Sequence, residues 1–376
     1  MIASLGRRTA SLCYGAGARL HRVFMRRTSG GRGRPACAVV SVGGLTVGGA
    51  GKTPFAARLA RALHERGWRV VLASAGYKGR SRDPVRIVSD GVFIRSDAGL
   101  SGDESYVLAA HAPGVPVLVG KDRRIVGHRA VSLFDAEILV LDDGFQHHRL
   151  ARDLDLVCID GVSGLGNGRV LPAGPLREPL SALRHADWLC MIDAEEGRGG
   201  GRPPEGGSGA SPDPGIRDPT LPDTISARLE RFDLASHRIV KARRRPLELL
   251  RLGRSDRRAL GTLRGLRVGL ISGIARPGSF RRTVESLGAE VVVERCFEDH
   301  HVYSMQDLEG LGHAGVDLWI TTEKDAVKIL PDWLGGRSLW VLVIEMEIER
   351  EGGFLDRIEA GLRGKGRLAE RPTRTP

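Results

Sequence analysis

Residues 41–54 constrain the fold of this chain most, because they combine the end of a strand, a glycine-rich turn and a helix start. Their sequence is Ser-Val-Gly-Gly-Leu-Thr-Val-Gly-Gly-Ala-Gly-Lys-Thr-Pro, and an apolar run over residues 38–42 leads into it. The backbone N–H groups of such a loop wrap anionic oxygens, and the helix that follows adds a positive dipole. The pattern predicts a phosphate loop in which Lys52 reaches the β and γ phosphates of a nucleotide and Thr53 holds Mg²⁺.

One position departs from the common phosphate-loop pattern, G-x-x-x-x-G-K-[ST], because Thr46 stands where the first glycine is expected. The alternative interpretation is a glycine-rich turn that carries a lysine by chance. The strand before the loop and the amphipathic segment after it favour nucleotide binding. The loop residues expected to contact the nucleotide are Thr46, Val47, Gly48, Gly49, Ala50, Gly51, Lys52 and Thr53.

Length and composition narrow the class of protein. The 376 residues suffice for two domains, and a hydrophobic content of 41% suffices for ordinary cores. The net charge of +12 attracts nucleic acid, an anionic membrane or a phosphorylated substrate. Aromatic residues make up only 5% of the chain and do not alternate with basic ones, so we expect no nucleic-acid partner. Five scattered cysteines without a C-x-x-C pair argue against a disulfide framework or a zinc site.

The order of apolar segments predicts two α/β domains. Strands alternate with helices over residues 35–193, which is typical of a P-loop NTPase-like domain with a mostly parallel sheet. Residues 194–223 are rich in Gly, Pro, Ser, Asp and Arg and predict a flexible insert or linker. The alternation then resumes over residues 224–376, which predicts a second, smaller α/β domain.

Residues 1–34 predict a basic amphipathic helix. This segment contains eight arginines, no acidic residue and interspersed apolar side chains, so a helix of this sequence would lie on an anionic membrane. The alternatives are a basic tail or a helix packed on the domain, and Gly15 and Gly17 weaken the helix. No uncharged apolar run approaches the roughly twenty residues that span a bilayer, so a spanning helix is not expected.

An apolar run that ends in two acids follows at residues 138–143, with the sequence Ile-Leu-Val-Leu-Asp-Asp. A carboxylate at the end of a strand beside a phosphate loop holds Mg²⁺ directly or through water. The alternative is that Asp142 and Asp143 only cap the turn that follows. The presence of the phosphate loop favours magnesium binding by Asp142 and Asp143 over capping. Residues 146–149, Gln-His-His-Arg, come next, and their spacing assigns them no role.

Asp103 has two interpretations. Ser101 and Glu104 have the spacing of a capping box before a helical run. This spacing places Asp103 in the first turn, where the helix dipole keeps its carboxylate ionised. An ionised aspartate near a γ-phosphate accepts a proton from an attacking hydroxyl. Spacing alone does not decide between a cap and a general base.

Three further segments carry candidate site residues. Residues 298–301, Glu-Asp-His-His, offer a partner for a catalytic aspartate or metal ligands, and zinc is the weaker option because no other Cys or His has zinc spacing. Prolines stiffen residues 169–179, which present Arg177 to a phosphate and Glu178 to Mg²⁺. Residues 321–325 form a helix cap or present Lys324 to an anionic ligand.

Together these segments resemble the tetraacyldisaccharide 4'-kinase (lipid A 4'-kinase) family. The resemblance rests on residues 45–54, 102–104, 142–147, 171–179, 299–301 and 321–325. It implies an enzyme that uses ATP and Mg²⁺ to phosphorylate the 4'-hydroxyl of an acylated glucosamine disaccharide phosphate, which forms lipid IVA in lipid A (lipopolysaccharide) biosynthesis. It also implies two α/β domains and attachment to the anionic cytoplasmic face of the bacterial inner membrane. We infer no obligate protein partner.

The resemblance also implies roles for single residues. Lys52 and Thr53 correspond to the phosphate-loop pair, Asp103 to the catalytic aspartate and His300 to the histidine paired with it. The acids of the magnesium site correspond to Asp142, Asp143 and Glu178.

One departure from the family pattern is Ala75, where the family usually has an arginine that contacts an anion. Lys78, Arg80 or Arg82 would replace it. The alternative function is a regulatory ATPase or GTPase switch. A switch explains the phosphate loop but neither the proline-rich loop nor the histidines of residues 299–301.

Overall fold

The structure is a computed structural model. It describes residues 11, 14, 15, 17, 33–76, 83–96, 98–194, 238–309, 311–312 and 315–369. The basic helix predicted for residues 1–34 and the insert predicted for residues 194–223 therefore lie almost wholly outside the described residues.

The chain forms two compact units, and each is discontinuous in sequence. Unit 1 comprises Met1–Ala56, Ala130–Arg243 and Glu347–Pro376, and unit 2 comprises Ala57–Arg129 and Arg244–Met346. Helices α2 (Lys52–Glu65) and α5 (Arg123–Phe134) contribute residues to both. The two predicted domains, residues 35–193 and 224–376, are instead continuous segments. Their boundaries stay a prediction.

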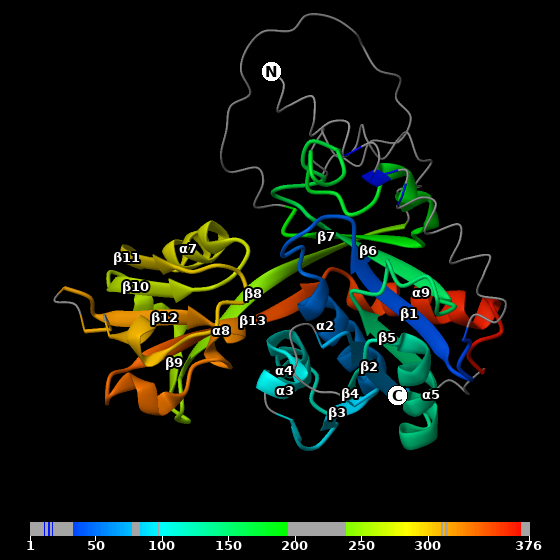
Figure 1. Ribbon diagram of the computed structural model, residues 1–376, viewed down its shortest axis with the longest axis horizontal. Helices are drawn as coiled ribbons and strands as arrows, with labels where there is room; N and C mark the ends of the chain where they lie inside the picture. Colours follow the sequence, from blue (N-terminus) through cyan, green and yellow to red (C-terminus); the bar gives the residue numbers. More distant parts are fainter. Residues whose placement is uncertain are drawn as a thin grey trace, which may run out of the picture. The chain divides into compact units, whose positions relative to one another are not determined.

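Unit 1 is built on a parallel sheet (Figure 1). Its strands run in the order β5, β1, β6, β7 and β8. Every residue of the first four is buried, as expected of parallel strands that are covered on both faces. The bounds are β1 (Ala38–Gly44), β5 (Ile138–Asp142), β6 (Leu154–Asp160), β7 (Trp188–Ile192) and β8 (Ile239–Arg251).

Helix α9 (Glu351–Gly364) closes part of the core of unit 1. The ring of its fully buried Phe354 packs edge-on against Phe55, with centroids 6.2 Å apart, and against Trp188, with centroids 5.2 Å apart. Edge-to-face aromatic pairs add to the stabilisation that burial itself provides. The short helix η1 (Leu180–His185) packs Ala182 and Leu183 into a second cluster of the same unit.

The first part of unit 2 contains strands β2, β3 and β4 and helices α3 and α4, and α4 begins at the catalytic candidate Asp103. Strand β4 lies parallel to β2 and antiparallel to β3. The bounds are β2 (Val70–Ser74), β3 (Arg86–Asp90), β4 (Pro116–Val119), α3 (Ala98–Ser101) and α4 (Asp103–His111).

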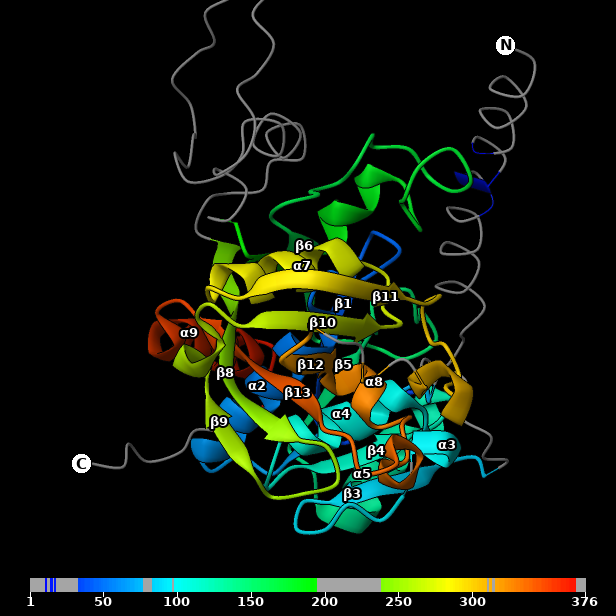
Figure 2. The same ribbon diagram turned by 90° about the vertical axis from the view of Figure 1, so that its left-hand side faces the viewer.

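The rest of unit 2 is a parallel sheet in the order β11, β10, β12 and β13. Helix α7 lies along β10 and β11 (Figure 2). Neighbouring residues of β10 face opposite sides, because Leu270 packs in one core cluster and Ile271 in the other. The predicted α/β fold with a mostly parallel sheet is confirmed.

The bounds of the remaining elements are β9 (Arg257–Ala259, antiparallel to β8), η5 (Leu260–Leu263), β10 (Arg267–Ser272), α7 (Pro277–Ser286), β11 (Glu290–Cys296), η6 (Met305–Leu308), β12 (Leu318–Thr322), α8 (Glu323–Ala326), η7 (Pro331–Leu334) and β13 (Leu339–Ile348).

Candidate active site

The predicted phosphate loop connects β1 to α2, and two glycines determine its path. Gly51 has φ +74°, and a Cβ on it would lie 2.9 Å from Cγ2 of Ile192, so a side chain there meets both backbone strain and a buried neighbour. A Cβ on Gly43 would overlap the Cβ of Phe145. The absence of that Cβ lets the segment after β5 lie directly against β1.

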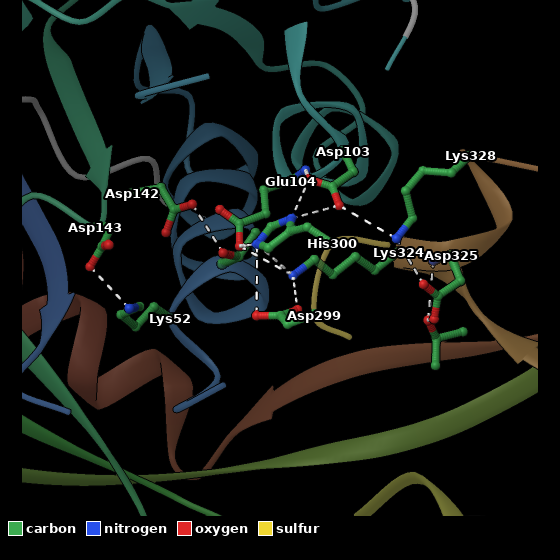
Figure 3. Close-up of polar contacts among 12 residues, drawn as sticks. Lys52, Asp103, Glu104, Asp142, Asp143, Asp299, His300, Lys324, Asp325 and Lys328 are labelled. Carbon is green, nitrogen blue, oxygen red and sulfur yellow. Dashed lines mark hydrogen bonds and ion pairs between the residues drawn. The ribbon is translucent and has the colours of Figure 1, made fainter. Parts of the chain in front are cut away.

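The phosphate-loop side chains meet the acids at the end of β5, as Figure 3 shows. The Lys52 Nζ lies 3.0 Å from Oδ1 of Asp143, and the Thr53 hydroxyl donates a hydrogen bond of 3.0 Å to Oδ2 of Asp142. Register explains the proximity, since Val42 of β1 pairs with Asp142 of β5. Parallel strands bring their carboxyl ends to one edge of a sheet, where ligands bind in α/β proteins.

Asp143 is held between two cations. The guanidinium of Arg177 donates a hydrogen bond of 2.7 Å to its Oδ2, while Lys52 lies on Oδ1. Burial alone would raise the pKa of Asp143, but attraction to Lys52 and Arg177 outweighs it and holds the pKa below its ordinary value. Its carboxylate therefore stays ionised at neutral pH.

The proline-rich loop pairs with the phosphate loop through the main chain. The amide of Val47 donates to the carbonyl of Pro175 at 2.8 Å, and the amide of Arg177 donates to the carbonyl of Leu45 at 2.6 Å. Thr46, buried to 4% exposure, forms an isolated β-bridge with Leu176. The residue that departs from the common phosphate-loop pattern thus lies where this second loop is joined to the first.

Glu178 is buried, and the Nε2 of His148 lies 3.8 Å from its Oε1. The side-chain amide of Gln146 donates to the carbonyl of Gly44 at 2.9 Å, which joins the turn after β5 to the start of the phosphate loop. Sequence reasoning left Gln146 and His148 without a role. The signal was their position directly after the acidic strand end, but spacing does not show which acid they meet.

The oxygen donors near Thr53 fit a magnesium ion that is shared with phosphates. Mg²⁺ prefers oxygen ligands and is usually held by one or two carboxylates together with substrate phosphates. The Thr53 hydroxyl and the Asp142 carboxylate, 2% exposed, are such donors and lie within hydrogen-bond distance of each other. Among the described residues, no group of three or more His, Cys, Asp or Glu side chains could hold a metal ion.

Asp103 is the first residue of α4. Its N-cap is Gly102, with φ 88°, and not Ser101, so the helix start does not fit the capping-box alternative for Ser101 and Glu104. Glycine at this position permits a positive φ that most side chains avoid. The Asp103 Oδ1 instead accepts a hydrogen bond of 2.9 Å from the Glu104 amide. An acidic residue in the first turn also interacts favourably with the helix dipole.

His300 pairs with Asp103 within unit 2. Its Nδ1 lies 2.9 Å from Oδ2 and 3.1 Å from Oδ1 of Asp103, whose side chain is almost fully buried (Figure 3). His300 adopts a left-handed backbone with φ 60° and donates its amide to the carbonyl of Gly273 at 3.2 Å. The pairing agrees with the role that the resemblance implies for His300. Its neighbour His301 stacks on Phe297 instead.

Residues 321–325 do form the predicted helix cap. Thr322 is the N-cap of α8, and its hydroxyl accepts a hydrogen bond from the Asp325 amide. Lys324 does not stand as an isolated cation for an anionic ligand, because its Nζ lies 3.0 Å from Asp299 and 3.6 Å from Glu104. Burial would lower the pKa of Lys324, but these acids outweigh it and raise the pKa, so the ammonium is retained.

The structure thus brings the predicted residues together in two groups. The group in unit 1 joins Lys52 and Thr53 to Asp142, Asp143 and Arg177. The group in unit 2 joins Asp103 to His300. Ala75 is exposed at the end of β2, and its proposed replacements lie outside the described residues.

A glycine-rich loop that leads into a helix beside an acidic strand end defines a P-loop nucleotide-binding protein of the α/β class. Comparison with known families shows which family of this class the chain belongs to. The chain belongs to the tetraacyldisaccharide-1-P 4'-kinase family, whose model matches residues 7–363.

Individual proteins similar to this chain support the same family. A tetraacyldisaccharide 4'-kinase from Syntrophus aciditrophicus (strain SB) is 37% identical over 349 residues, which cover 92% of this chain and 89% of that protein. One from Anaeromyxobacter sp. (strain Fw109-5) is 41% identical over 319 residues, with 83% and 79% covered. The crystal structure of LpxK from Aquifex aeolicus in complex with ATP superposes with a TM-score of 0.71 at 28% identity, over 96% of this chain and 99% of that one.

These matches confirm the predicted family and the predicted α/β fold, and they show that the chain is a kinase. They do not favour the alternative of a regulatory switch. Among the described residues, no helix is both long and apolar enough to cross a membrane.

Proposed function

We propose that this chain is a lipid kinase that transfers the γ-phosphate of ATP to the 4'-hydroxyl of tetraacyldisaccharide 1-phosphate. The observation that carries the proposal is the family match over residues 7–363, which includes the phosphate loop and both members of the Asp103–His300 pair. The product of such a transfer is lipid IVA, a precursor of lipid A.

On the donor side, the loop amides and Lys52 hold the phosphates of ATP. Lys52 is largely buried, so its charge is poorly screened by water and acts strongly on a phosphate oxygen. Arg177 offers a planar guanidinium that suits bidentate contact with phosphate. A bound Mg²⁺ neutralises charge that develops on the transferred group, and Thr53, Asp142, Asp143 and Glu178 are the residues proposed to hold it.

On the acceptor side, Asp103 accepts the proton of the sugar hydroxyl. A general base needs a fixed orientation, and the His300 Nδ1 contacts both carboxylate oxygens of Asp103 at 2.9 and 3.1 Å. Phosphoryl transfer has a loose transition state, so a carboxylate is a sufficient base when the hydroxyl is well placed.

The test measures transfer of labelled γ-phosphate from ATP to tetraacyldisaccharide 1-phosphate in detergent micelles. We expect Asp103→Ala to lower kcat by about 10²-fold or more while ATP binding stays close to wild type. Glu309→Ala, which removes an exposed carboxylate of the same unit, serves as the matched control and keeps full turnover. Near-normal turnover of Asp103→Ala would refute the assignment of the base. Label recovered only as free phosphate from the wild type would refute lipid phosphorylation.

Attachment to the anionic inner-membrane surface, at its cytoplasmic face, is a separate part of the proposal. It is supported by the eight arginines and missing acids of residues 1–34. Deletion of residues 1–27 is expected to abolish co-sedimentation with anionic vesicles and to leave ATP binding intact. Unchanged co-sedimentation of the deleted protein would refute this anchor.

A further inference from the structure

Lys324 contacts the ring of His300 at the nitrogen that does not face Asp103. Its Nζ lies 3.1 Å from the Nε2 of His300, on the side of the ring opposite the Nδ1 that faces Asp103 (Figure 3). The segment between Leu318 and Ala326, strand β12 followed by helix α8, brings this lysine to the histidine. This contact belongs to no role assigned above, and its consequence follows from the hydrogen-bonding capacity of the two groups.

A lysine ammonium has three donors and no acceptor, whereas a neutral imidazole has one donor nitrogen and one acceptor nitrogen. In the neutral ring, the nitrogen that contacts Lys324 is therefore the acceptor, and the ring proton lies on Nδ1. From Nδ1 it is donated to the carboxylate of Asp103. The hydrogen-bond partners of His300 thus assign the tautomer, which distances alone do not.

We propose that Lys324 is a positioning residue, which keeps His300 in the neutral tautomer that donates its Nδ1 proton to the base Asp103. The proposal rests on the proposed kinase function. It adds a residue to that reaction, and it gives Lys324 a role other than the binding of an anion.

The charges around the ring explain why the lysine is needed. Glu104 on α4 and Asp299 on the histidine's own loop each place a carboxylate oxygen 3.8 Å from Nε2, beyond hydrogen-bond range. Without the ammonium, these two anions would favour the doubly protonated imidazolium. Lys324 lies on both acids and on Nε2, so it offsets part of their negative charge and places a positive charge where a second ring proton would go.

The other groups near this pair act on Asp103 rather than on Nε2. Lys328, which follows α8, has its Nζ 3.8 Å from Oδ2 of Asp103 and 2.8 Å from Oδ1 of Asp325. Asp325 is fully buried and also accepts from the Thr322 hydroxyl and the Gly273 amide. Lys328 is therefore anchored by a second acid, and removal of Lys324 leaves that part of the network in place.

The decisive variant is Lys324→Met, which keeps the length of the side chain and removes its donors. We expect kcat at neutral pH to fall at least about tenfold, with the KM for ATP unchanged. We expect the acidic limb of the kcat–pH profile to move to higher pH, because the carboxylates of Glu104 and Asp299 then lie near Nε2 without the neighbouring cation. Lys324→Arg, which keeps the cation and its donors, restores the acidic limb toward the wild type.

A second measurement separates this inference from the kinase proposal. The ¹⁵N NMR shifts of the His300 ring, assigned by comparison with His300→Gln, need no lipid substrate. We expect an unprotonated Nε2 in the wild type and a protonated one in Lys324→Met below neutral pH. Lys241→Met, which removes a lysine on β8 in the other unit, is the matched control and leaves both readouts unchanged.

Two outcomes would overturn the inference. A protonated Nε2 in the wild type at neutral pH would show that Lys324 does not set the tautomer. A Lys324→Met protein with the wild-type melting temperature, pH profile and ring shifts would show the same. If the wild type did not phosphorylate the disaccharide, the kinase proposal would fail, but the ring shifts would still decide the role of Lys324.

Discussion

Gly51→Ala tests how the phosphate loop is built. Gly51 has φ +74°, a region that costs a non-glycine residue about 1–2 kcal/mol. The added methyl would lie 2.9 Å from Cγ2 of Ile192, a fully buried side chain on β7. Overpacking of this kind costs about 1–3 kcal/mol. The two terms together predict a loss of about 2–5 kcal/mol in the free energy of unfolding.

Gly49→Ala is the matched control, because it adds the same methyl two residues away in the same loop. A Cβ on Gly49 would meet no atom within 4 Å. We therefore expect it to change the free energy of unfolding by no more than about 0.5 kcal/mol. Urea denaturation of the purified wild type and the two variants measures the difference directly.

The double variant Gly51→Ala/Ile192→Ala separates strain from overlap. Ile192→Ala alone is expected to cost about 2–5 kcal/mol through the cavity that it leaves. In the Gly51→Ala background it should cost less, because removal of Cγ2 relieves the overlap, and a coupling of about 1–2 kcal/mol is expected. If Gly51→Ala proves as stable as Gly49→Ala, both the strain and the overlap argument are refuted.

Three further predictions concern buried charge, pH and packing. Asp325→Asn should lower the free energy of unfolding, measured in urea, by about 3–5 kcal/mol, because it removes the buried Asp325 carboxylate that pairs with the ammonium of Lys328. A loss below about 1 kcal/mol would contradict this. Burial raises the pKa of Asp307, but hydrogen bonds from Ser304 outweigh it and hold the pKa low. The stabilisation that its carboxylate provides is therefore complete above its unfolded pKa of about 3.9 and is lost as pH falls through the folded pKa. The difference in Tm between the wild type and Asp307→Asn should accordingly vanish in acid, and a difference that stays constant with pH would refute this. Phe354→Ala should cost about 3–5 kcal/mol in the same denaturation assay, and a cost below 1 kcal/mol would show that its aromatic contacts are unimportant.

The phosphate loop was predictable because its signals are local. The apolar run, the glycines and the Lys52–Thr53 pair lie within a few residues, and each determines its own backbone or contact. The acids at residues 142–143 were predictable for the same reason, since an apolar run directly precedes them. In both cases one strand and the turn after it contain all the information.

The Asp103–His300 pair was not predictable from spacing, because 197 residues separate its members. Spacing left a capping box and a general base open for this segment, and the structure has Gly102 rather than Ser101 as the N-cap. The resemblance to a family, not a physical argument, indicated that the two residues act together. Lys324 was identified from its strand-to-helix position, but only the fold shows that its neighbours are acids and an imidazole.

The contact between the two loops was missed for a different reason. Prolines indicated a rigid segment over residues 169–179, but main-chain hydrogen bonds leave no trace in the side-chain sequence. The amides of Val47 and Arg177 bond to carbonyls of the opposite loop, so Arg177 is placed by its backbone. Any residue except proline offers such an amide.

The two groups of site residues differ in charge, and the difference matches the chemistry proposed for each. In unit 1, Lys52 and Arg177 stand against the three acids proposed to hold magnesium, Asp142, Asp143 and Glu178, so a bound Mg²⁺ would supply the further positive charge that phosphate oxygens need. In unit 2, the carboxylates of Asp103, Glu104, Asp299 and Asp325 lie near the ammonium groups of Lys324 and Lys328, so four negative charges stand against two positive ones. A net negative cluster repels phosphate oxygens and attracts a proton. The unit 2 group is therefore suited to take a proton from a hydroxyl, as proposed for Asp103.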